Sequence, residues 1–440
     1  WPRWQRGAGS AEEAGRGAPE AERLEGLLAS RSSIVAMLGA AMFSMLGFTM
    51  TTPALPLLRA RYHLSPEKVG LISASFAAGM FFAVAFLPKW SDRHGRKWTA
   101  SLALMCVAGG FALQGFAIFQ RLRFEQFLFV RFLTGLFAGC NPIFKAYLAD
   151  VVPYSRLPEF MIYREASATM AFIVGPSLGG WLAASRLGPA GPFWATAISQ
   201  LLGSLLIALF VEESVGLRQR PPAPDADGSL RSPAGAEAEP DRWQWSLAAL
   251  VFVMSFLYVI SQSCFSSFFP LLMSDCFRSL PGDIGETITR TAVVALVFQV
   301  CLYRRLVRWI SLKWVSFLGA LAIFLGLALL GFAGRAGLEA SKGCPSAILW
   351  VGIGIYGFGV ASFPAFIPTV LARVVPPTQR GVALGIDSIV NNICRIWAPW
   401  HLGQLYSRSP GLCFSAGGSS MLFVSLLVLY LGDRTRGEKL

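Results

Sequence analysis

The chain has 440 residues, of which 54% are hydrophobic and 14% are charged, and its mean hydropathy is +0.54. Ordinary soluble domains carry about 25% charged residues, so this composition excludes a water-soluble globular protein and indicates a chain that lies in a lipid bilayer. The formal net charge is +13, but the basic residues are spread between apolar stretches, which argues against a nucleic-acid-binding surface.

Apolar windows long enough to cross a membrane recur along almost the whole chain. A helix needs about 20 apolar residues to span the hydrocarbon layer. We predict about twelve spans, near residues 33–58, 69–88, 98–119, 125–149, 158–185, 191–211, 245–272, 287–306, 313–334, 346–373, 381–406 and 411–432. These stretches are too long and too continuously apolar for barrel strands. The sequence therefore predicts an all-α, polytopic membrane protein.

Polar segments divide these spans into two groups of six. Residues 1–32 are rich in Ala, Gly, Arg and Glu, and we expect a disordered N-terminal tail there. Residues 213–243 are rich in Pro, Gly and charge, which predicts a flexible cytoplasmic linker. The linker separates an N-terminal six-helix bundle at 33–212 from a C-terminal bundle at 244–433, and a short tail follows at 434–440.

The distribution of Lys and Arg predicts the orientation of the chain. With the N-terminus inside, the inner loops hold roughly twice as many basic residues as the outer loops. We therefore expect both termini to face the cytoplasm or its organellar equivalent.

A basic loop at residues 89–98 separates the second and third spans. Its Asp-Arg-x-Gly-Arg-Lys core resembles the loop 2–3 signature of the major facilitator superfamily of membrane transporters. The residues that fit are Asp92, Arg93, Gly95, Arg96 and Lys97. The leading Gly of the family falls at Pro88 here, and the resemblance extends over roughly residues 33–433.

The resemblance implies that this loop is a gate. Asp92 would meet the start of the eleventh span near residues 380–381, where the partial positive charge of a helix N-terminus stabilises an acid. Arg93 or Arg96 would meet Asp150 at the end of the fourth span, and breaking these contacts would change which side is open. The alternative is that both acids are simply solvated.

The equivalent loop of the second half, at residues 304–314, keeps basic charge but lacks the Asp-Arg pair. We therefore expect an asymmetric gate.

Charged residues inside the spans are candidates for binding substrate or protons, because a charge at bilayer depth is costly unless it is paired or hydrated. The candidates are Arg131, Lys145, Arg164, Glu165, Asp387 and Arg395. Asp387, Asn391 and Arg395 follow at i, i+4 and i+8, which places them on one helical face. The alternative for each is a structural ion pair or a side chain that reaches the membrane surface.

The fourth and fifth spans carry further motifs. Arg131 begins a segment that resembles the Arg-x-x-Gln-Gly element of the family, with Thr134 in place of Gln. The fifth span resembles the antiporter signature of the drug:proton branch, which implies export; the matching residues are Gly175, Pro176, Gly179 and Gly180. Pro removes a helix hydrogen bond and Gly allows close helix approach, so this segment can bend and pack tightly.

The two halves repeat one another. Residues 148–153 match residues 371–376 at a shift of 223, and the same shift carries Pro176 onto Pro399 and Gly180 onto Gly403. Two six-helix repeats with a site between them are a common plan for transporters.

No motif indicates an enzyme, a cofactor or a metal site. The eight Cys lack paired metal spacing, and no phosphate-binding loop or nucleophile elbow is present. Cys276 and Cys344 lie in loops expected on the outer side, and a disulfide between them is left open.

Three functions remain. The first is a secondary active exporter of amphipathic or drug-like small molecules that works by alternating access and is coupled to protons. The second is an importer or facilitator of a polar metabolite or organic anion, favoured because cations outnumber acids in the spans. The third is a non-transporting membrane receptor or scaffold. We expect a monomer in the bilayer, whose substrate, direction and coupling ion the sequence leaves open.

Overall fold

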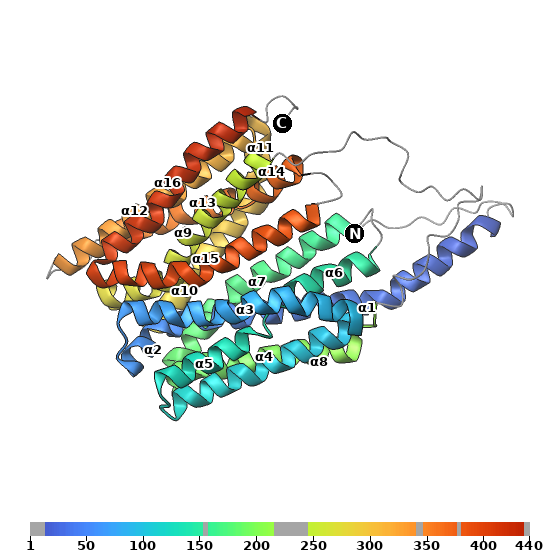
Figure 1. Ribbon diagram of the computed structural model, residues 1–440, viewed down its shortest axis with the longest axis horizontal. Coiled ribbons are helices and arrows are strands. Elements are labelled where there is room, and N and C mark those ends of the chain that lie inside the picture. Colours follow the sequence, from blue (N-terminus) through green and yellow to red (C-terminus); the bar gives the residue numbers. More distant parts are fainter. Residues whose placement is uncertain (1–13, 153–156, 215–244, 340–345, 376–379, 435–440) are drawn as a thin grey trace.

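The computed structural model describes residues 14–152, 157–214, 245–339, 346–375 and 380–434, and these residues form helices and no strand (Figure 1). The N-terminal half contains α1 (Ala14–Met50), η1 (Thr52–Ala54), α2 (Leu55–Tyr62), α3 (Pro66–His94), α4 (Arg96–Phe119), α5 (Phe124–Gly135), α6 (Asn141–Val151), α7 (Leu157–Ala184), η2 (Gly188–Ala190) and α8 (Gly191–Phe210). The C-terminal half contains α9 (Trp245–Phe277), α10 (Pro281–Phe298), the π-helix η3 (Gln299–Tyr303), α11 (Arg304–Ile310), α12 (Leu312–Glu339), α13 (Ser346–Ser362), α14 (Phe366–Val374), α15 (Arg380–Arg408) and α16 (Pro410–Arg434).

The prediction of an all-α membrane fold with about twelve spans is confirmed. Within the described residues, 10 helical segments are long and apolar enough to cross a membrane. The two other spans fall outside that set for physical reasons. The fourth is broken between α5 and α6, where Pro142 can begin a helix but not continue one. The eleventh, α15, carries the polar side chains of Asp387, Asn391 and Arg395.

The internal repeat is visible in the helix ends. The tenth span is also broken, between α13 and α14. Val152 directly follows α6 and Val375 directly follows α14, both with extended backbone, and these positions are 223 residues apart. The amide of Val152 donates to the carbonyl of Leu148 at 2.9 Å, and that of Val375 donates to Leu371 at 3.1 Å. The repeated sequence therefore forms the same helix terminus twice.

The polar segments are described only in part. Helix α1 begins at Ala14, so helix occupies much of the range 1–32 in which we expected a disordered tail; its Ala and Glu residues favour helix. Of the predicted linker at 213–243, Glu213 and Ser214 are described and the remainder lies outside the described residues, as do 435–440. The disulfide that the sequence left open, between Cys276 and Cys344, also involves a residue outside that set.

The two halves meet along two seams, and the first lies between α7 and α10. A Cβ atom added to Gly180 would overlap the carbonyl oxygen of Pro281, and one added to Gly285 would overlap that of Pro176. The backbones of the two helices are therefore in direct contact, which only residues without a side chain permit.

The second seam repeats this arrangement between α15 and α3. A Cβ atom on Gly70 would overlap the carbonyl oxygen of Pro399, and one on Gly403 would overlap the backbone of Pro66. Gly403 and Pro399 are the 223-residue equivalents of Gly180 and Pro176. Helices α3 and α15 lie side by side here and diverge toward the opposite end of the molecule (Figure 1).

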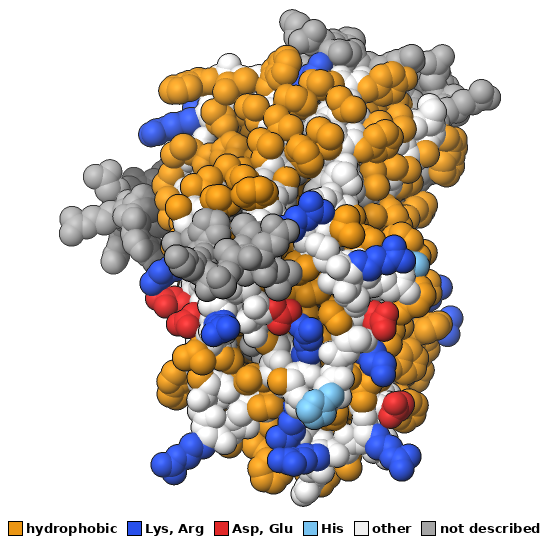
Figure 2. Space-filling model, turned by 90° about the vertical axis from the view of Figure 1, so that its left-hand side faces the viewer, with side chains coloured by type: hydrophobic (Ala, Val, Ile, Leu, Met, Phe, Trp, Pro, Cys, Tyr) orange, Lys and Arg blue, Asp and Glu red, His pale blue; other side chains and the backbone are white. Residues whose placement is uncertain are grey.

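These seams define a sealed end, which includes the start of α3, the end of α9 and the start of α10. The opposite linker end includes the end of α3, the end of α8 and the start of α9. An ion pair between Arg59 and Asp275 joins the halves at the sealed end, and the hydroxyl of Tyr406 donates to Asp275 at 3.1 Å. Figure 2 views this end, where acidic and basic side chains gather across the middle and lower part of the face.

The glycines of the α7 signature have two different neighbours. Cβ atoms on Gly175 and Gly179 would overlap Thr49 and Met50 of α1, which belong to the same half. Gly180 instead contacts α10 of the other half. The signature therefore packs α7 against its own bundle through Gly175 and Gly179, and against the second bundle through Gly180.

We predict that Gly180→Ala and Gly403→Ala separate the halves at the sealed end, because each added methyl group meets rigid backbone at a cost of about 1–3 kcal/mol. Labelling of Ser73→Cys by a membrane-impermeant maleimide should increase several-fold, since the hydroxyl of Ser73 on α3 lies 3.1 Å from that of Ser267 on α9, across the boundary between the halves. Gly385→Ala is the matched control on α15, because nothing lies within 4 Å of the added atom. Equal labelling in all three variants would contradict this view of the seams.

Candidate functional site

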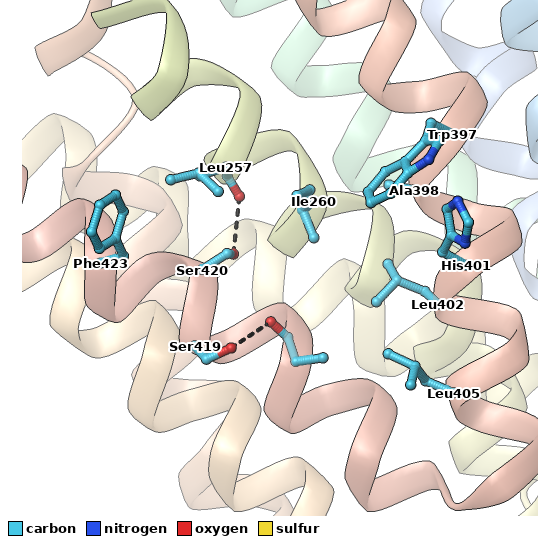
Figure 3. Close-up of a pocket in the computed structure, with 11 residues that line it drawn as sticks. Leu257, Ile260, Trp397, Ala398, His401, Leu402, Leu405, Ser419, Ser420 and Phe423 are labelled. Carbon is cyan, nitrogen blue, oxygen red and sulfur yellow. Dashed lines mark hydrogen bonds between the residues drawn. The ribbon is translucent and has the colours of Figure 1, made fainter. Parts of the chain in front are cut away.

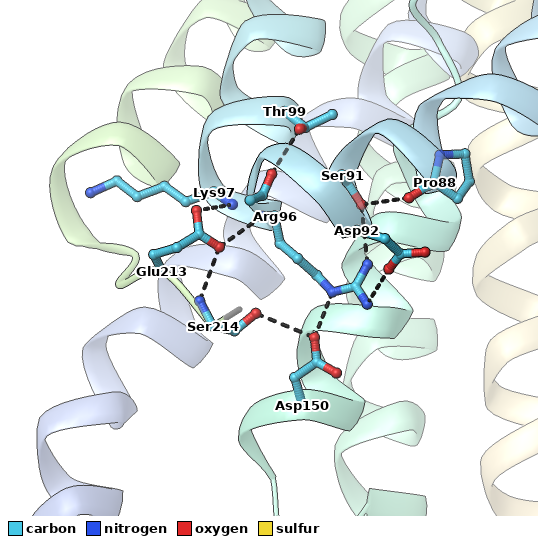
Figure 4. Close-up of polar contacts among 10 residues, drawn as sticks. Pro88, Ser91, Asp92, Arg96, Lys97, Thr99, Asp150, Glu213 and Ser214 are labelled. Carbon is cyan, nitrogen blue, oxygen red and sulfur yellow. Dashed lines mark hydrogen bonds and ion pairs between the residues drawn. The ribbon is translucent and has the colours of Figure 1, made fainter. Parts of the chain in front are cut away.

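A cluster centred on Arg96 joins three helices of the N-terminal half at the linker end (Figure 4). The guanidinium group donates to Asp150 at 2.5 Å, to Asp92 at 2.9 Å and to the hydroxyl of Ser91 at 3.1 Å. The side chains of Arg96 and Asp150 are only 6% and 10% exposed, whereas that of Asp92 is 48% exposed. The buried pair forms the centre of the cluster, and Asp92 closes it on the open side.

The turn from α3 into α4 needs a glycine. Gly95 has a φ of +101°, and a side chain there would also overlap the carboxylate of Glu213. That carboxylate accepts the amides of Arg96 at 2.7 Å and Lys97 at 3.2 Å, so it satisfies unpaired donors at the start of α4 and matches the positive end of the helix dipole. Ser214 adds a bond from its hydroxyl to Asp150 at 3.3 Å.

Sequence reasoning missed Glu213. The sequence does place two acids, Glu212 and Glu213, directly after the sixth apolar stretch, and this pair could have indicated a polar contact there.

The other loop residues occupy different surroundings. Of the two arginines expected to meet Asp150, Arg96 does so and Arg93 is exposed. Asp92 pairs with Arg96. Its expected approach to residues 380–381 involves side chains that lie outside the described set.

The second half keeps the turn but has no arginine at its centre. Ser311 lies 216 residues after Gly95 and also has a positive φ, of +78°. Lys313 corresponds to Lys97, and each Nζ lies over the ring of the Trp that follows it, at 5.7 and 5.6 Å. Leu312 occupies the position of Arg96, so the arginine-centred cluster cannot form there. The two loops therefore differ in sequence at this position, and the asymmetric gate stays a prediction.

The polar stripe of α15 faces α9. Asn391 donates to one carboxylate oxygen of Asp387 at 3.1 Å and accepts from the hydroxyl of Ser255 at 2.9 Å. The other oxygen of Asp387 is buried and has no hydrogen-bond partner. Two turns further along, Arg395 donates to the amide oxygen of Gln262 at 3.4 Å. The stripe therefore has an acidic part near the linker end and a basic part near its middle.

The region of α7 that corresponds to Asp387 of α15 carries a positive charge instead of a negative one. Arg164 lies 223 residues before Asp387, is buried, and donates to Asn141 of α6 and to Glu165. Glu165 is largely exposed and also lies 3.5 Å from the Nζ atom of Lys145. This cluster contains its own countercharge, so the two halves present different charges at matching positions.

Arg131 is separate from these clusters. It donates to the carbonyl of Ile72 at 2.6 Å and to Gln114 at 3.0 Å, and its guanidinium carbon lies 5.5 Å from the centre of the Phe76 ring and 6.0 Å from that of Phe193. The charge is thus enclosed among α3, α4, α5 and α8, all of the N-terminal half. Its position favours a structural role over a role in binding substrate or protons.

A cavity of about 320 Å³ lies between α9, α15 and α16 (Figure 3). Its walls are mostly apolar, and the hydroxyl of Ser420 is bonded to the carbonyl of Leu257 at 3.1 Å. Trp397 and Phe423 on its rim are about half exposed. The exposure of these two apolar side chains places the cavity at the surface of the bundle, and the lining does not include Asp387, Asn391 or Arg395.

We predict losses of stability of very different size for two changes in the Arg96 cluster. Arg96→Leu leaves the buried carboxylate of Asp150 without its cation and should lower the free energy of unfolding by about 3–5 kcal/mol. Asp92→Asn removes a half-exposed pair and should cost about 0–1 kcal/mol. Melting temperatures in detergent measure both, and an equal fall in the two variants would contradict the ranking.

Comparison with known proteins identifies the family of the chain. A family model of the Major Facilitator Superfamily matches residues 37–399. Multidrug resistance protein 2 of Bacillus subtilis is 25% identical over 386 residues, which are 86% of this chain and 89% of the relative. Quinolone resistance protein NorA of Staphylococcus aureus is 23% identical over 270 residues, 60% of this chain and 65% of the relative.

Solved structures share the fold at lower identity. The human organic anion transporter MFSD10 (TETRAN) superposes with a TM-score of 0.65 at 19% identity, covering 91% of this chain and 99% of that one. A D-xylose-proton symporter gives a TM-score of 0.69 at 16% identity, with 93% and 99% covered. The family match, the repeated six-helix halves and the apolar helices lead to one conclusion. The chain belongs to the major facilitator superfamily and is an integral, multi-pass membrane transporter.

Proposed function

We propose that this transporter exports small amphipathic molecules in exchange for protons, by alternating access between its two halves. The observation that carries the proposal is its similarity to two multidrug resistance proteins of Bacillus subtilis over more than four fifths of the chain. The names of these relatives favour export over uptake, and the Gly-Pro signature of α7 agrees with that choice.

The packing of α15 supports the alternating-access part of the proposal. At Pro399 and Gly403 this helix contacts the backbone of α3. On the same face but closer to the linker end, Leu384 and Ser388 are exposed and nothing surrounds Gly385. The same face of α15 is therefore packed against α3 at the sealed end and exposed nearer the linker end. This is the arrangement expected of a transporter that is closed at one end and open at the other.

We assign the linker end to the cytoplasm, because the basic loops that contain Arg96 and Lys313 lie there. Both termini and the linker then lie on the cytoplasmic side. The protein would work as a monomer, since each of its seams joins the two halves of one chain.

The Arg96 cluster is proposed as the gate of the linker end. Asp92 is its exposed acidic member, and it can change partner with little cost while the buried pair of Arg96 and Asp150 stays intact.

For Asp92→Asn, we therefore predict a folded, inserted protein in which transport is reduced about tenfold or more, a change of at least ~1.4 kcal/mol in the transition between states. Uptake into proteoliposomes measures this, and Arg290→Gln, which removes an exposed ion pair on α10, is the control. Full activity of Asp92→Asn would show that the loop has no gating role.

Asp387 is the proposed proton carrier. A proton-coupled transporter needs an acid that can exchange its charge inside the membrane. No described cation forms an ion pair with Asp387, and one of its oxygens has no hydrogen-bond partner. Glu165 is the second candidate, but it already contacts Arg164 and Lys145.

Asp387→Asn should abolish accumulation driven by a pH gradient, while part of the downhill exchange is retained, because the neutral amide keeps the bond geometry but cannot release a proton. Glu165→Gln should keep most of the accumulation. Both variants are compared in proteoliposomes with and without an imposed pH gradient. Unaltered accumulation in both would overturn proton coupling through either acid and favour a facilitator.

A further inference from the structure

Arg395 is a charged side chain near the middle of a membrane-spanning helix. It lies about 20 Å from either end of α15, at 1.5 Å per residue. Its one hydrogen-bond partner among the described residues is the neutral amide of Gln262, at 3.4 Å. Asp387 is about 12 Å away along the same helix and is bonded to Asn391 instead. The charge of Arg395 therefore has no carboxylate partner in the described part of the chain.

The three arginines Arg96, Arg131 and Arg164 are neutralised or enclosed. Arg96 has two carboxylates, and Arg164 has Glu165. Arg131 is buried and held by a carbonyl, an amide and two aromatic rings. Arg395 differs because it is partly exposed and has a single weak partner. A cation at this depth without a countercharge is costly, so a bound anion would relieve that cost.

Arg395 lies close to the α3–α15 seam. It lies one turn before Pro399, whose carbonyl contacts Gly70 of α3, and residues four apart share a helix face. The same face is exposed at Ser388. Ile393 and Trp397, on the other side of α15, are exposed on the apolar surface. Arg395 thus lies one turn from the seam, on the part of α15 between the seam and the exposed face at Ser388.

Gln262 completes the arrangement. Its amide oxygen accepts from Arg395, so its NH₂ group is left with two donors that have no partner in the described residues. A guanidinium group and an amide NH₂ together match the two oxygens of a carboxylate, which guanidinium binds in a planar, bidentate manner.

We propose that Arg395 and Gln262 form a subsite for the anionic group, a carboxylate or sulfonate, of an amphipathic transported molecule. The position equivalent to Arg395 in the first half is Phe172, which is 40% exposed. One half therefore presents a cation and the other an aromatic ring at matching positions, which suits a molecule with an anionic group and an apolar body. The inference rests on the proposed export of small amphipathic molecules and names their chemical class.

Three probes with one aromatic body test the subsite: 2-naphthoate, 2-naphthamide and 2-naphthylmethylammonium. Their export is measured in proteoliposomes under a pH gradient for the unmodified chain, Arg395→Gln, Arg395→Lys and Gln262→Glu. Arg290→Gln is the control, because it removes an exposed cation of the same half that already has an acidic partner.

For the unmodified chain we expect kcat/KM for 2-naphthoate to exceed that for the amide by about tenfold or more, the size of a charge-assisted hydrogen bond. Arg395→Gln should remove this preference and change amide transport less than twofold, while Arg395→Lys retains part of it. Gln262→Glu should act like Arg395→Gln, since it supplies an internal carboxylate to Arg395 and does not leave an unpaired charge. The control should resemble the unmodified chain.

The outcomes separate the subsite from the proposed function. If the amide or the ammonium compound is exported and the carboxylate has no advantage, or if its advantage survives in both Arg395→Gln and Gln262→Glu, the subsite is wrong and export stands. If none of the three probes moves under the gradient, the proposed export of amphipathic molecules fails and the subsite with it.

Discussion

Direct contact between helix backbones at the sealed end is the constraint on which the remaining structure depends. Gly180 and Gly285 bring α7 and α10 together, and Gly70 and Gly403 do the same for α3 and α15. Because no side chain lies between these backbones, neither seam can yield by rotamer changes. The halves can be together there or apart, and intermediate separations would leave voids that a packed interior disfavours.

This constraint gives the charged residues their separate roles. Arg96 and Arg164 have acidic partners within one bundle, so they can stay paired while the two bundles move. Asp387 and Arg395 lie on the helix that takes part in a seam, and the structure gives each only neutral partners. Charges that are satisfied inside a bundle maintain the bundle, whereas charges satisfied only by amides are available to a solute or a proton.

Much of the fold could be predicted because it depends on local patterns. Span length, hydropathy and the 223-residue shift follow from the chain alone, and helical periodicity placed Asp387, Asn391 and Arg395 on one face. Contacts between distant segments could not be predicted in this way. Glu213 caps α4 across 117 residues of chain, and Arg59 meets Asp275 across 216. Gly70 and Gly285 resemble any other glycine of a membrane helix until the opposite backbone is seen.

The contact of Glu213 with α4 also bears on how the chain could be divided. The carboxylate that caps α4 and the hydroxyl of Ser214 that reaches Asp150 both belong to the last described residues before α9. A break anywhere within residues 215–244 would leave both on the first fragment, whose Arg96 cluster would remain complete. The seams that join the fragments are backbone contacts needing no covalent connection. Each half therefore contains all the residues of its own described polar clusters. Assembly of the protein from two separate polypeptides is compatible with every contact described for the Arg96 cluster.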